Sequence, residues 1–383
     1  MFGLLRRYFP IALLHLYVAA RLLADLWPAG AFATGALGLW LITSAALIPL
    51  SFMARRSTMR TLRSRVLAWT GLIAMGMFSS LFVLTLLRDV LLLGGFTLSL
   101  FSHIEEPLRQ FRYLSAIAVP LIAALFTAVG FVNARKRADV RAVEVPIADL
   151  PAALHGFTIA QISDLHIGPT IKGRHLSAIV DAVNELNADM VAITGDLVDG
   201  SVAELAAHTQ SLSRLTARHG AFFVTGNHEY YSGARAWIAE MRRLGINVLL
   251  NEHVVLEHEG QDVVVAGVTD YSAGYFDPSQ KSDPAAAIAG APGTAGVSVL
   301  LAHQPRSAFA ADKAGFDLQL SGHTHGGQFL PWNFFVRFQQ PFTAGLHRLG
   351  ELWVYVSRGT GYWGPPKRLG APSEITHLKL VPA

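Results

Sequence analysis

Five short apolar runs in the second half of the chain each end in polar residues of kinds that bind metals. Most of the runs are rich in β-branched or aromatic residues and stop at glycine or polar turns, which predicts strands. In layered α/β folds, ligands gather at the carboxyl ends of the strands. The sequence therefore predicts an α/β domain whose strand ends converge on one site. The runs are Phe157–Ser163, Met190–Thr194, Ala221–Thr225, Val297–Ala302 and Phe316–Ser321.

The motifs after these runs supply imidazole, carboxylate and amide groups together. Imidazole suits zinc, manganese and iron, so the mixed set indicates transition metals rather than calcium or magnesium alone. Two ions roughly 3.5–4 Å apart need a shared ligand, and such a pair is suited to attack on a phosphate ester. Because the chain has no cysteine, the ligands must be nitrogen and oxygen atoms. The motifs are Asp164-Leu165-His166, Gly195-Asp196-Leu197-Val198-Asp199, Gly226-Asn227-His228-Glu229, Ala302-His303-Gln304-Pro305 and Gly322-His323-Thr324-His325.

The order and spacing of these motifs resemble those of the calcineurin-like metallophosphoesterase superfamily, from roughly Arg141 to the C-terminus. The resemblance implies two mixed β-sheets sandwiched between helices. It also implies two divalent or trivalent transition metal ions, with manganese, iron or zinc expected. The implied ligands are Asp164, His166 and His325 for the first ion, Asn227, His303 and His323 for the second, and Asp196 as the bridge.

The same resemblance assigns roles to residues beside the ligands. His228 matches the family histidine that stabilises the transition state or protonates the leaving oxygen. Asp199 is expected to hold a ligand or that histidine in place. Glu229 departs from the pattern, because many relatives have aspartate there, and its role stays open.

The first third of the chain has the composition of a membrane region. The whole chain is 52% hydrophobic and only 15% charged. A helix needs roughly 20 apolar residues to cross a bilayer, and four stretches are about that long. Arg21 and Asp25 lie one helical turn apart near the end of the first stretch, so they are expected to pair with each other or to snorkel, with a functional intramembrane charge as the alternative. The stretches are Phe9–Leu26, Phe32–Ala54, Val66–Leu87 and Leu114–Val132.

The positions of lysine and arginine predict how these spans are oriented. Positively charged residues concentrate at both ends of the region and between the second and third spans, which indicates that these segments are cytoplasmic. An even number of spans then places the catalytic domain in the cytoplasm of an integral inner or plasma membrane protein. The basic residues are Arg6, Arg7, Arg55, Arg56, Arg60, Arg63, Arg65, Arg135, Lys136, Arg137 and Arg141.

The charge of the chain is divided unevenly. Residues 1–134 hold 11 arginines and four acidic residues, whereas residues 135–383 hold 20 basic and 23 acidic residues. The basicity therefore belongs to the membrane region, and the rest of the chain is mildly acidic. A nucleic-acid partner is not expected.

The chain is predicted to have three parts. Residues 1–134 form a transmembrane region of about four helices, 135–156 a juxtamembrane linker with the first strand from Val143, and 157–383 the metallophosphoesterase domain. Helices are predicted between the strands, and consecutive strands after about Leu250. The predicted helices are Gly173–Asn187, Ala203–Arg218, Ala234–Leu244 and Pro305–Ala314.

Two further patterns have competing interpretations. Gly359–Gly364 matches G-x-G-x-x-G, but the two prolines that follow argue against the helix that a dinucleotide fingerprint needs, so a turn is predicted. Phe329–Phe338 is rich in aromatic residues. It either fills the core beneath the metal site or forms a loop that dips into the membrane interface, with Arg337 at lipid phosphate.

These observations predict a membrane-anchored, dinuclear metal-dependent phosphoesterase. Its substrate is expected to carry a phosphoester or diphosphate bond and to be lipid-linked, because the membrane anchor holds the site near lipid. Within the superfamily, the chain most resembles membrane-attached phosphoesterases and hydrolases of UDP-diacylglucosamine. Two alternatives stay open. One is a tethered phosphodiesterase or nucleotidase for soluble substrates, and the other is a membrane sensor or transport protein with a regulatory phosphoesterase domain.

Overall fold

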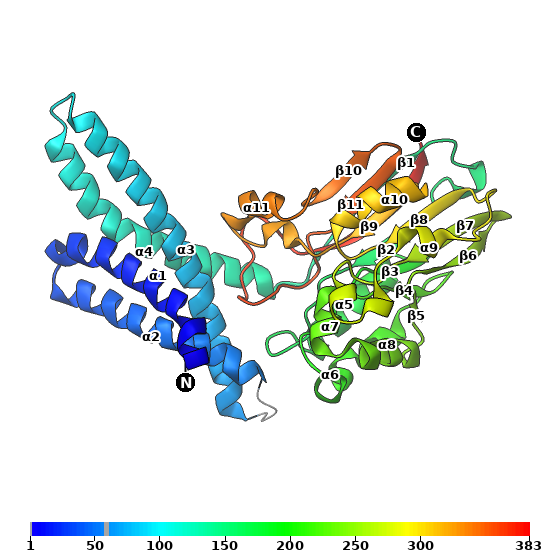
Figure 1. Cartoon of the computed structure of the whole chain (residues 1–383), viewed down its shortest axis with the longest axis horizontal. Coiled ribbons are helices and arrows are strands. Elements are labelled where there is room, and N and C mark those ends of the chain that lie inside the picture. The colour runs from blue at the N-terminus through cyan, green and yellow to red at the C-terminus, as the bar shows by residue number, and fades with distance from the viewer. Residues whose placement is uncertain (1, 57–60) are drawn as a thin grey trace. The chain divides into compact units, whose positions relative to one another are not determined.

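The computed structural model describes residues 2–56 and 61–383, and the chain divides into two units. The first unit consists of Met1–Asn133 together with Gly364–Lys367. The second consists of Ala134–Trp363 together with Arg368–Ala383 (Figure 1). Arg60 of the predicted basic loop lies outside the described residues.

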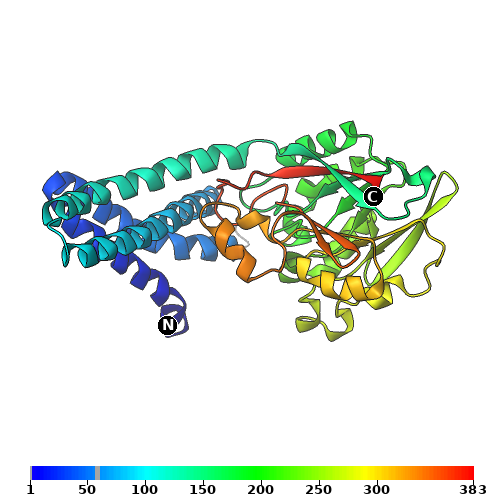
Figure 2. The same cartoon turned by 90° about the horizontal axis from the view of Figure 1, so that it is seen from above.

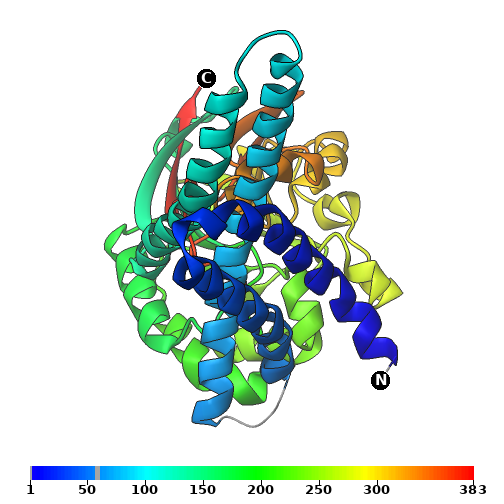
Figure 3. The ribbon, with the colours of Figure 1, turned by 90° about the vertical axis from the view of Figure 1, so that its left-hand side faces the viewer.

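Within the described residues, four helices are long and apolar enough to cross a membrane, as the sequence predicted. Figure 3 shows them as a group of long helices, in which α3 and α4 form a hairpin. Leu22 and Leu81 are fully buried among the helices, whereas Phe32 is 91% exposed and Leu93 66% exposed. Large apolar side chains on the outside of a helix bundle are suited to lipid rather than to water. The helices are α1 (Phe2–Leu26), α2 (Ala31–Arg56), α3 (Leu62–Ser99) and α4 (Glu105–Arg135).

The charged residues near the ends of these helices pair between helices. Arg21 of α1 donates to Asp89 of α3 at 2.8 Å rather than to Asp25, one turn away on α1. Asp25 instead accepts from the buried Arg88 of α3. The predicted pairing of Arg21 with Asp25 is therefore wrong, because partners on α3 satisfy both charges. A buried charge without such a partner would be costly. Snorkelling of Arg21 stays a prediction.

The short segment Gly364–Lys367 belongs to the helical unit despite its late position in the sequence. Its lysine is buried, and the ammonium group donates to the Gly76 carbonyl at 3.0 Å, to Ser80 Oγ at 2.6 Å and to Thr127 Oγ1 at 3.2 Å. Three oxygen acceptors satisfy the three donors of the lysine ammonium group.

The second unit contains two six-stranded mixed sheets, as the sequence predicted. In the first sheet β2 to β5 are parallel, β12 is antiparallel to β2, and β1 lies parallel beside β12, as Figure 2 also shows. Its strands, in spatial order, are β1 (Asp139–Ile147), β12 (Glu374–Pro382), β2 (Thr158–Ile162), β3 (Met190–Ile193), β4 (Ala221–Phe223) and β5 (Asn247–Val248).

In the second sheet the four inner strands are parallel and the two edge strands are antiparallel to their neighbours. Parallel inner strands place their carboxyl ends at one edge, which is the edge where ligands bind in such folds. The strands, in spatial order, are β10 (Gly345–Leu349), β11 (Leu352–Val356), β9 (Leu318–Ser321), β8 (Val297–Leu301), β7 (Gln261–Gly267) and β6 (Glu252–His258).

The two sheets pack face to face, and helices cover their outer faces. Ile159 and Phe222 of the first sheet share one buried cluster with Val299 and Leu320 of the second. The outer face of the first sheet packs against α5 (Gly173–Glu185), α6 (Val202–Thr209) and α8 (Ala234–Arg243), and that of the second against α9 (Pro284–Ile288) and α10 (Ala308–Ala314). This arrangement confirms the predicted sandwich.

Several element boundaries differ from the prediction. The first strand begins at Asp139 instead of Val143, because its first residues also pair with β12. These residues are exposed, so the sequence there lacks the apolar pattern by which a strand is predicted. The helix predicted over Ala203–Arg218 ends at Thr209 and continues as a tighter 3-10 helix over Gln210–Arg214. Three short helices were not predicted, α7 (Asn227–Ser232), α9 (Pro284–Ile288) and α11 (Trp332–Phe335).

Candidate metal centre

The structure brings the predicted ligands together at the carboxyl ends of five strands. Asp164 and His166 follow β2, Asp196 follows β3, and Asn227 follows β4, all from the first sheet. The second sheet contributes the remaining histidines. These are His303, which follows β8, and His323 and His325, which follow β9.

Several of these residues have a backbone conformation that is unusual for residues other than glycine. Asp164, His166, Asp196, His323 and His325 have φ angles of 53°, 48°, 51°, 71° and 51°. The left-handed region costs on the order of 1 kcal/mol or more for a residue with a Cβ atom, and such residues cluster at functional sites. The strain gives a reason, independent of the motifs, to regard these turns as a functional site.

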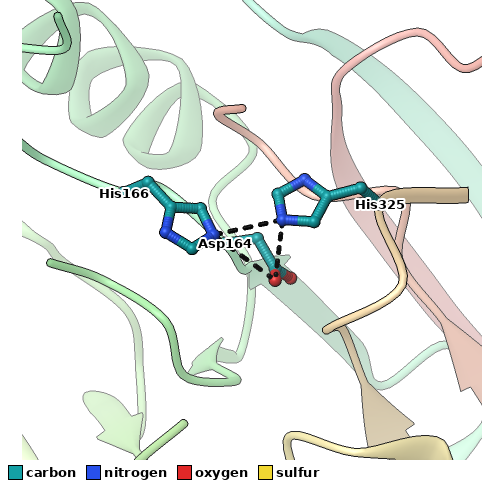
Figure 4. A group of neighbouring side chains, drawn as sticks. All are labelled: Asp164, His166 and His325. Carbon is teal, nitrogen blue, oxygen red and sulfur yellow. Dashed lines mark hydrogen bonds and ion pairs between the residues drawn. The ribbon is translucent and has the colours of Figure 1, made fainter. Parts of the chain in front are cut away.

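One group of ligand atoms comes from Asp164, His166 and His325, which point toward one another in Figure 4. The Nε2 atoms of the two histidines are 3.1 Å apart, and Nε2 of His325 is 3.3 Å from Oδ1 of Asp164. Atoms bound at about 2.0–2.2 Å to one ion lie about 3–3.5 Å from each other, so this group fits one metal ion.

A second group comes from Asp196, His303 and His323. Nε2 of His303 lies 3.2 Å from Oδ2 of Asp196 and 3.2 Å from Nδ1 of His323. The same Oδ2 atom is 3.9 Å from Nε2 of His166. One carboxylate oxygen of Asp196 therefore lies near a histidine of each group. Burial would raise the pKa of Asp196, but the facing His303, His228 and His166 rings hold this pKa below its usual range.

Hydrogen bonds at the far side of two rings leave their Nε2 atoms available as ligands. Nδ1 of His166 donates to the Asp199 carboxylate at 3.1 Å, and Nδ1 of His303 donates to the Thr194 carbonyl at 2.8 Å. A proton on Nδ1 of a neutral ring leaves the lone pair on Nε2, which is the usual arrangement of metal-binding histidines.

Asn227 gives a separate indication of a metal. Asn227 is 8% exposed, and its Oδ1 atom is buried without a hydrogen-bond partner among the described residues. An unpaired buried amide oxygen is costly, whereas a metal ion would satisfy it. Asn227 lies at the start of α7, directly after the Gly226 turn, so it fits the predicted role of a ligand.

The predicted catalytic residue His228 is held by Asp199. Oδ1 of Asp199 accepts from Nδ1 of His228 at 2.6 Å, and Nε2 of His228 faces Oδ2 of Asp196 at 4.0 Å. Burial lowers the pKa of His228, but the hydrogen bond to Asp199 and the charge of Asp196 outweigh burial and raise it. Burial would raise the pKa of Asp199. The facing His166 and His228 rings nevertheless hold this pKa well below its usual range.

Glu229, whose role the sequence left open, links two of the ligand loops. Its carboxylate is fully buried and accepts the backbone N–H groups of Asp196 at 3.0 Å, Leu197 at 2.8 Å and Gly226 at 2.6 Å. Burial and the nearby Asp196 raise the pKa of Glu229 to about 8, while the Gly226 and Leu197 N–H groups act in the opposite direction. The side chain fixes the Asp196 loop against the Asn227 loop.

Sequence reasoning missed Arg368, which is 1% exposed and supports His325. Its guanidinium donates to the carbonyls of His325 at 3.1 Å and Arg358 at 2.8 Å, and lies 3.1 Å from Nδ1 of His325. Burial, together with the charge of Arg368, lowers the pKa of His325 well below its usual value. No motif surrounds Arg368. It lies 43 residues after His325 in the sequence, and only the fold brings the two residues together.

Two aromatic residues beside His228 were also missed. The rings of Tyr231 and Trp363 meet the His228 imidazole edge to face, with centroid distances of 5.1 and 5.8 Å. Tyr231 is 62% exposed and Trp363 44% exposed, so both border the solvent-accessible side of the centre. Tyr231 could have been predicted, because a residue three positions after His228 on a helix faces the same side. No local pattern indicated Trp363.

The G-x-G-x-x-G match forms a turn, as predicted, with no helix after it. A Cβ atom on Gly361 would lie 2.8 Å from the Asp164 carbonyl oxygen, closer than real Cβ contacts. The Gly361 N–H donates to the same carbonyl at 3.1 Å. This glycine therefore lets the turn pack directly against the loop that carries Asp164 and His166.

Comparisons with known proteins show what this chain is similar to. The calcineurin-like phosphoesterase family profile matches residues 157–327. The zebrafish "Transmembrane protein with metallophosphoesterase domain" is 37% identical over 297 residues, covering 76% of this chain and 68% of that protein. An uncharacterized metallophosphoesterase of Campylobacter jejuni is 35% identical over 271 residues, covering 70% of each. A solved 5'-nucleotidase precursor from Thermus thermophilus is 14% identical, with a TM-score of 0.38, covering 59% of this chain and 54% of that one.

Proposed function

Because this chain belongs to the calcineurin-like phosphoesterase family and is a metal-dependent phosphoester hydrolase embedded in a membrane, we propose that it uses two metal ions to cleave a lipid-linked phosphoester or diphosphate. The observation that carries the dinuclear proposal is the position of one Asp196 oxygen, 3.2 Å from His303 and 3.9 Å from His166. Each histidine belongs to a different ligand group.

In this proposal the first ion is held by Asp164, His166 and His325, the second by Asn227, His303 and His323, and Asp196 is shared. Two ions held in this way would activate water near neutral pH and offset the negative charge that develops on the phosphoryl oxygens. Donors of this kind favour manganese, iron or zinc.

His228 has the geometry to protonate the leaving oxygen. Its Nδ1 is fixed by Asp199 at 2.6 Å, which leaves Nε2 directed into the centre. A ring whose pKa is raised holds its proton more readily and is suited to donate it in the transition state. The raised pKa of His228 supports this role, and the exposed Tyr231 and Trp363 rings beside it are placed to border the leaving group.

The membrane region supports a lipid-linked substrate. Only residues 136–138 separate α4 from β1, and three residues span roughly 10 Å at most. A catalytic domain attached this closely to a bilayer meets substrates in the headgroup region at high local concentration. The positive residues flanking the spans support a cytoplasmic position for this domain.

Metal analysis and a substrate panel on the purified full-length protein test the function. The expected result is about two metal ions per chain, hydrolysis of lipid-linked esters in preference to soluble ones, and little activity in Asp196→Ala. An active wild-type protein without metal would contradict the mechanism. Equal turnover of soluble esters would contradict the lipid proposal and favour the tethered phosphodiesterase or nucleotidase.

A fusion experiment tests the orientation separately. A reporter that is active only in the cytoplasm, fused after Ala383, is expected to be active, and a reporter that is active only in the periplasm is expected to be silent. The reverse pair of results would contradict the cytoplasmic proposal without bearing on the chemistry.

A further inference from the structure

The aromatic segment after the last metal histidine forms an exposed ridge instead of core. Trp332 and Phe335 belong to α11, and Phe338 follows within the adjoining helical turn Val336–Phe338. These three residues are 41%, 50% and 76% exposed. The expectation that this segment fills the core is therefore wrong for its aromatic rings. Only Phe329, at its beginning, is buried.

The ridge rings contact one another in a row. The centroids of Trp332 and Phe335 are 5.9 Å apart, and those of Phe335 and Phe338 are 6.5 Å apart. The spacing of three residues places the rings along one side of consecutive helical turns. Arg337 lies with its guanidinium carbon 5.4 Å from the Phe338 ring centroid, so a cation adjoins the aromatic row.

The ridge packs directly against the turn that begins at the proposed metal ligand His325. Gly327, in the turn that begins at His325, packs so closely on Asn333 of α11 that a Cβ atom could not fit between them. The Trp332 N–H donates to the Phe329 carbonyl at 2.9 Å, and the Leu330 N–H to the Leu369 carbonyl at 2.9 Å. The backbone of α11, labelled in Figure 1, is thus held in place while its large side chains remain exposed.

A cationic pocket of about 480 Å³ continues from the ridge. Its lining includes Gln339 and Pro341, which directly follow the ridge, and the side chains of Arg306, Lys313 and Tyr271. The Arg306 guanidinium carbon lies 5.3 Å from the Tyr271 ring centroid, and Nε donates to Gln340 Oε1 at 3.3 Å. The second cation, Lys313, forms no ion pair with an acidic side chain of the described residues.

We propose that the aromatic ridge Trp332–Phe338 and the Arg306–Lys313 pocket form one surface that binds the headgroup region of an anionic phospholipid bilayer. Tryptophan and phenylalanine rings beside cations are the composition of interfacial elements, because rings enter the acyl boundary and cations meet lipid phosphate. Only residues 136–138 connect α4, which is long and apolar enough to cross a bilayer, to the unit that carries this surface. The surface is distinct from the reacting groups, so it stands whatever ester the enzyme cleaves.

The absence of cysteine allows a direct test on the full chain. A nitroxide label on Phe335→Cys is compared with one on Val255→Cys, an exposed position on β6, in nanodiscs that contain phosphatidylglycerol. The expected result is high accessibility of the Phe335 label to oxygen and about fivefold lower accessibility to a water-soluble nickel complex than at Val255. Thermal unfolding and metal content of both labelled proteins verify that each is folded.

Each other result would overturn the proposal. A Phe335 label as accessible to nickel as the Val255 label would show that the ridge lies in water. A label protected from both nickel and oxygen would show that another protein surface, such as a second copy, covers it.

A second arm tests the pocket. In phosphatidylcholine discs without anionic lipid, nickel protection of the Phe335 label is expected to weaken, since the two cations would no longer be attracted to an anionic surface. Lys313→Gln combined with Arg306→Gln is expected to abolish this dependence on lipid charge. If the double variant retains the full dependence, the pocket has no part in the surface.

Discussion

The Oδ1 atom of Asp199 lies 2.6 Å from Nδ1 of His228 and 3.1 Å from Nδ1 of His166. One carboxylate therefore orients both the proposed proton donor and a proposed metal ligand. In the sequence, Asp199 lies 29 positions from His228 and 33 positions from His166.

Replacing Asp199 with alanine should affect chemistry and metal binding together. We expect kcat and metal affinity each to fall by about 10–100-fold, because neither ring would be held in its orientation. Steady-state kinetics and metal titration measure the two effects. The matched variant His228→Ala should lower kcat while metal affinity stays near that of the wild type. Wild-type metal affinity in Asp199→Ala would show that His166 does not depend on this contact.

The buried amide of Asn227 leads to a prediction about metal content. Asn227→Ala removes the Oδ1 atom that has no protein partner among the described residues, so we expect loss of one of the two metals. Asn227→Asp keeps an oxygen at the same position and should keep both metals. Metal analysis of the two purified variants distinguishes them. Full metal content in Asn227→Ala would contradict the proposed role of this residue.

The order of the strands and the ligands that follow them could be predicted from the sequence, because alternating apolar runs and short motifs are local signals. The membrane helices could be predicted for the same reason. Residues such as Arg368 and Trp363 could not, since each reaches the centre only through the fold. The pairing of Arg21 with Asp89 is a further example, in which a contact 68 residues away replaces the local one.

The left-handed turns show a different limit of sequence reasoning. Asp164 and Asp196 adopt φ angles of 53° and 51°, although aspartate is only moderately tolerant of that region. Distant residues contact these turns through hydrogen bonds. The Glu229 carboxylate, for example, accepts a hydrogen bond from the Asp196 N–H group. A local pattern contains no information about such bonds.

Gly226 should be indispensable because of its packing. A Cβ atom there would collide with the side chain and backbone of Asp196, so Gly226→Ala must displace the proposed bridging carboxylate. We expect a loss of about 1–3 kcal/mol in the free energy of unfolding together with loss of activity. Gly293→Ala is the control, because nothing lies within 4 Å of a Cβ atom at that position. Equal stability and activity of the two variants would show that the Asp196 loop adapts.

The charges between the membrane helices lead to the last prediction. Arg88 is 2% exposed, pairs with Asp25 and donates to Ser115 Oγ at 2.9 Å. Asp25→Ala would leave the buried guanidinium with only the more distant Asp89 carboxylate, at 3.7 Å, so we expect a loss of about 1.5–3 kcal/mol in stability. Unfolding of the full-length protein in detergent measures this effect.

An exposed ion pair in the same unit is the control for that prediction. Arg109 and Glu106 pair with side chains that are 78% and 70% exposed, so Glu106→Ala should change stability by less than about 1 kcal/mol. Replacing Asp25 and Arg88 together with apolar residues should recover much of the stability lost in Asp25→Ala, because no unpaired charge remains. If the double variant is stable but loses turnover of a lipid substrate, the pair serves signalling between the helices and the enzyme. That outcome would favour the sensor alternative.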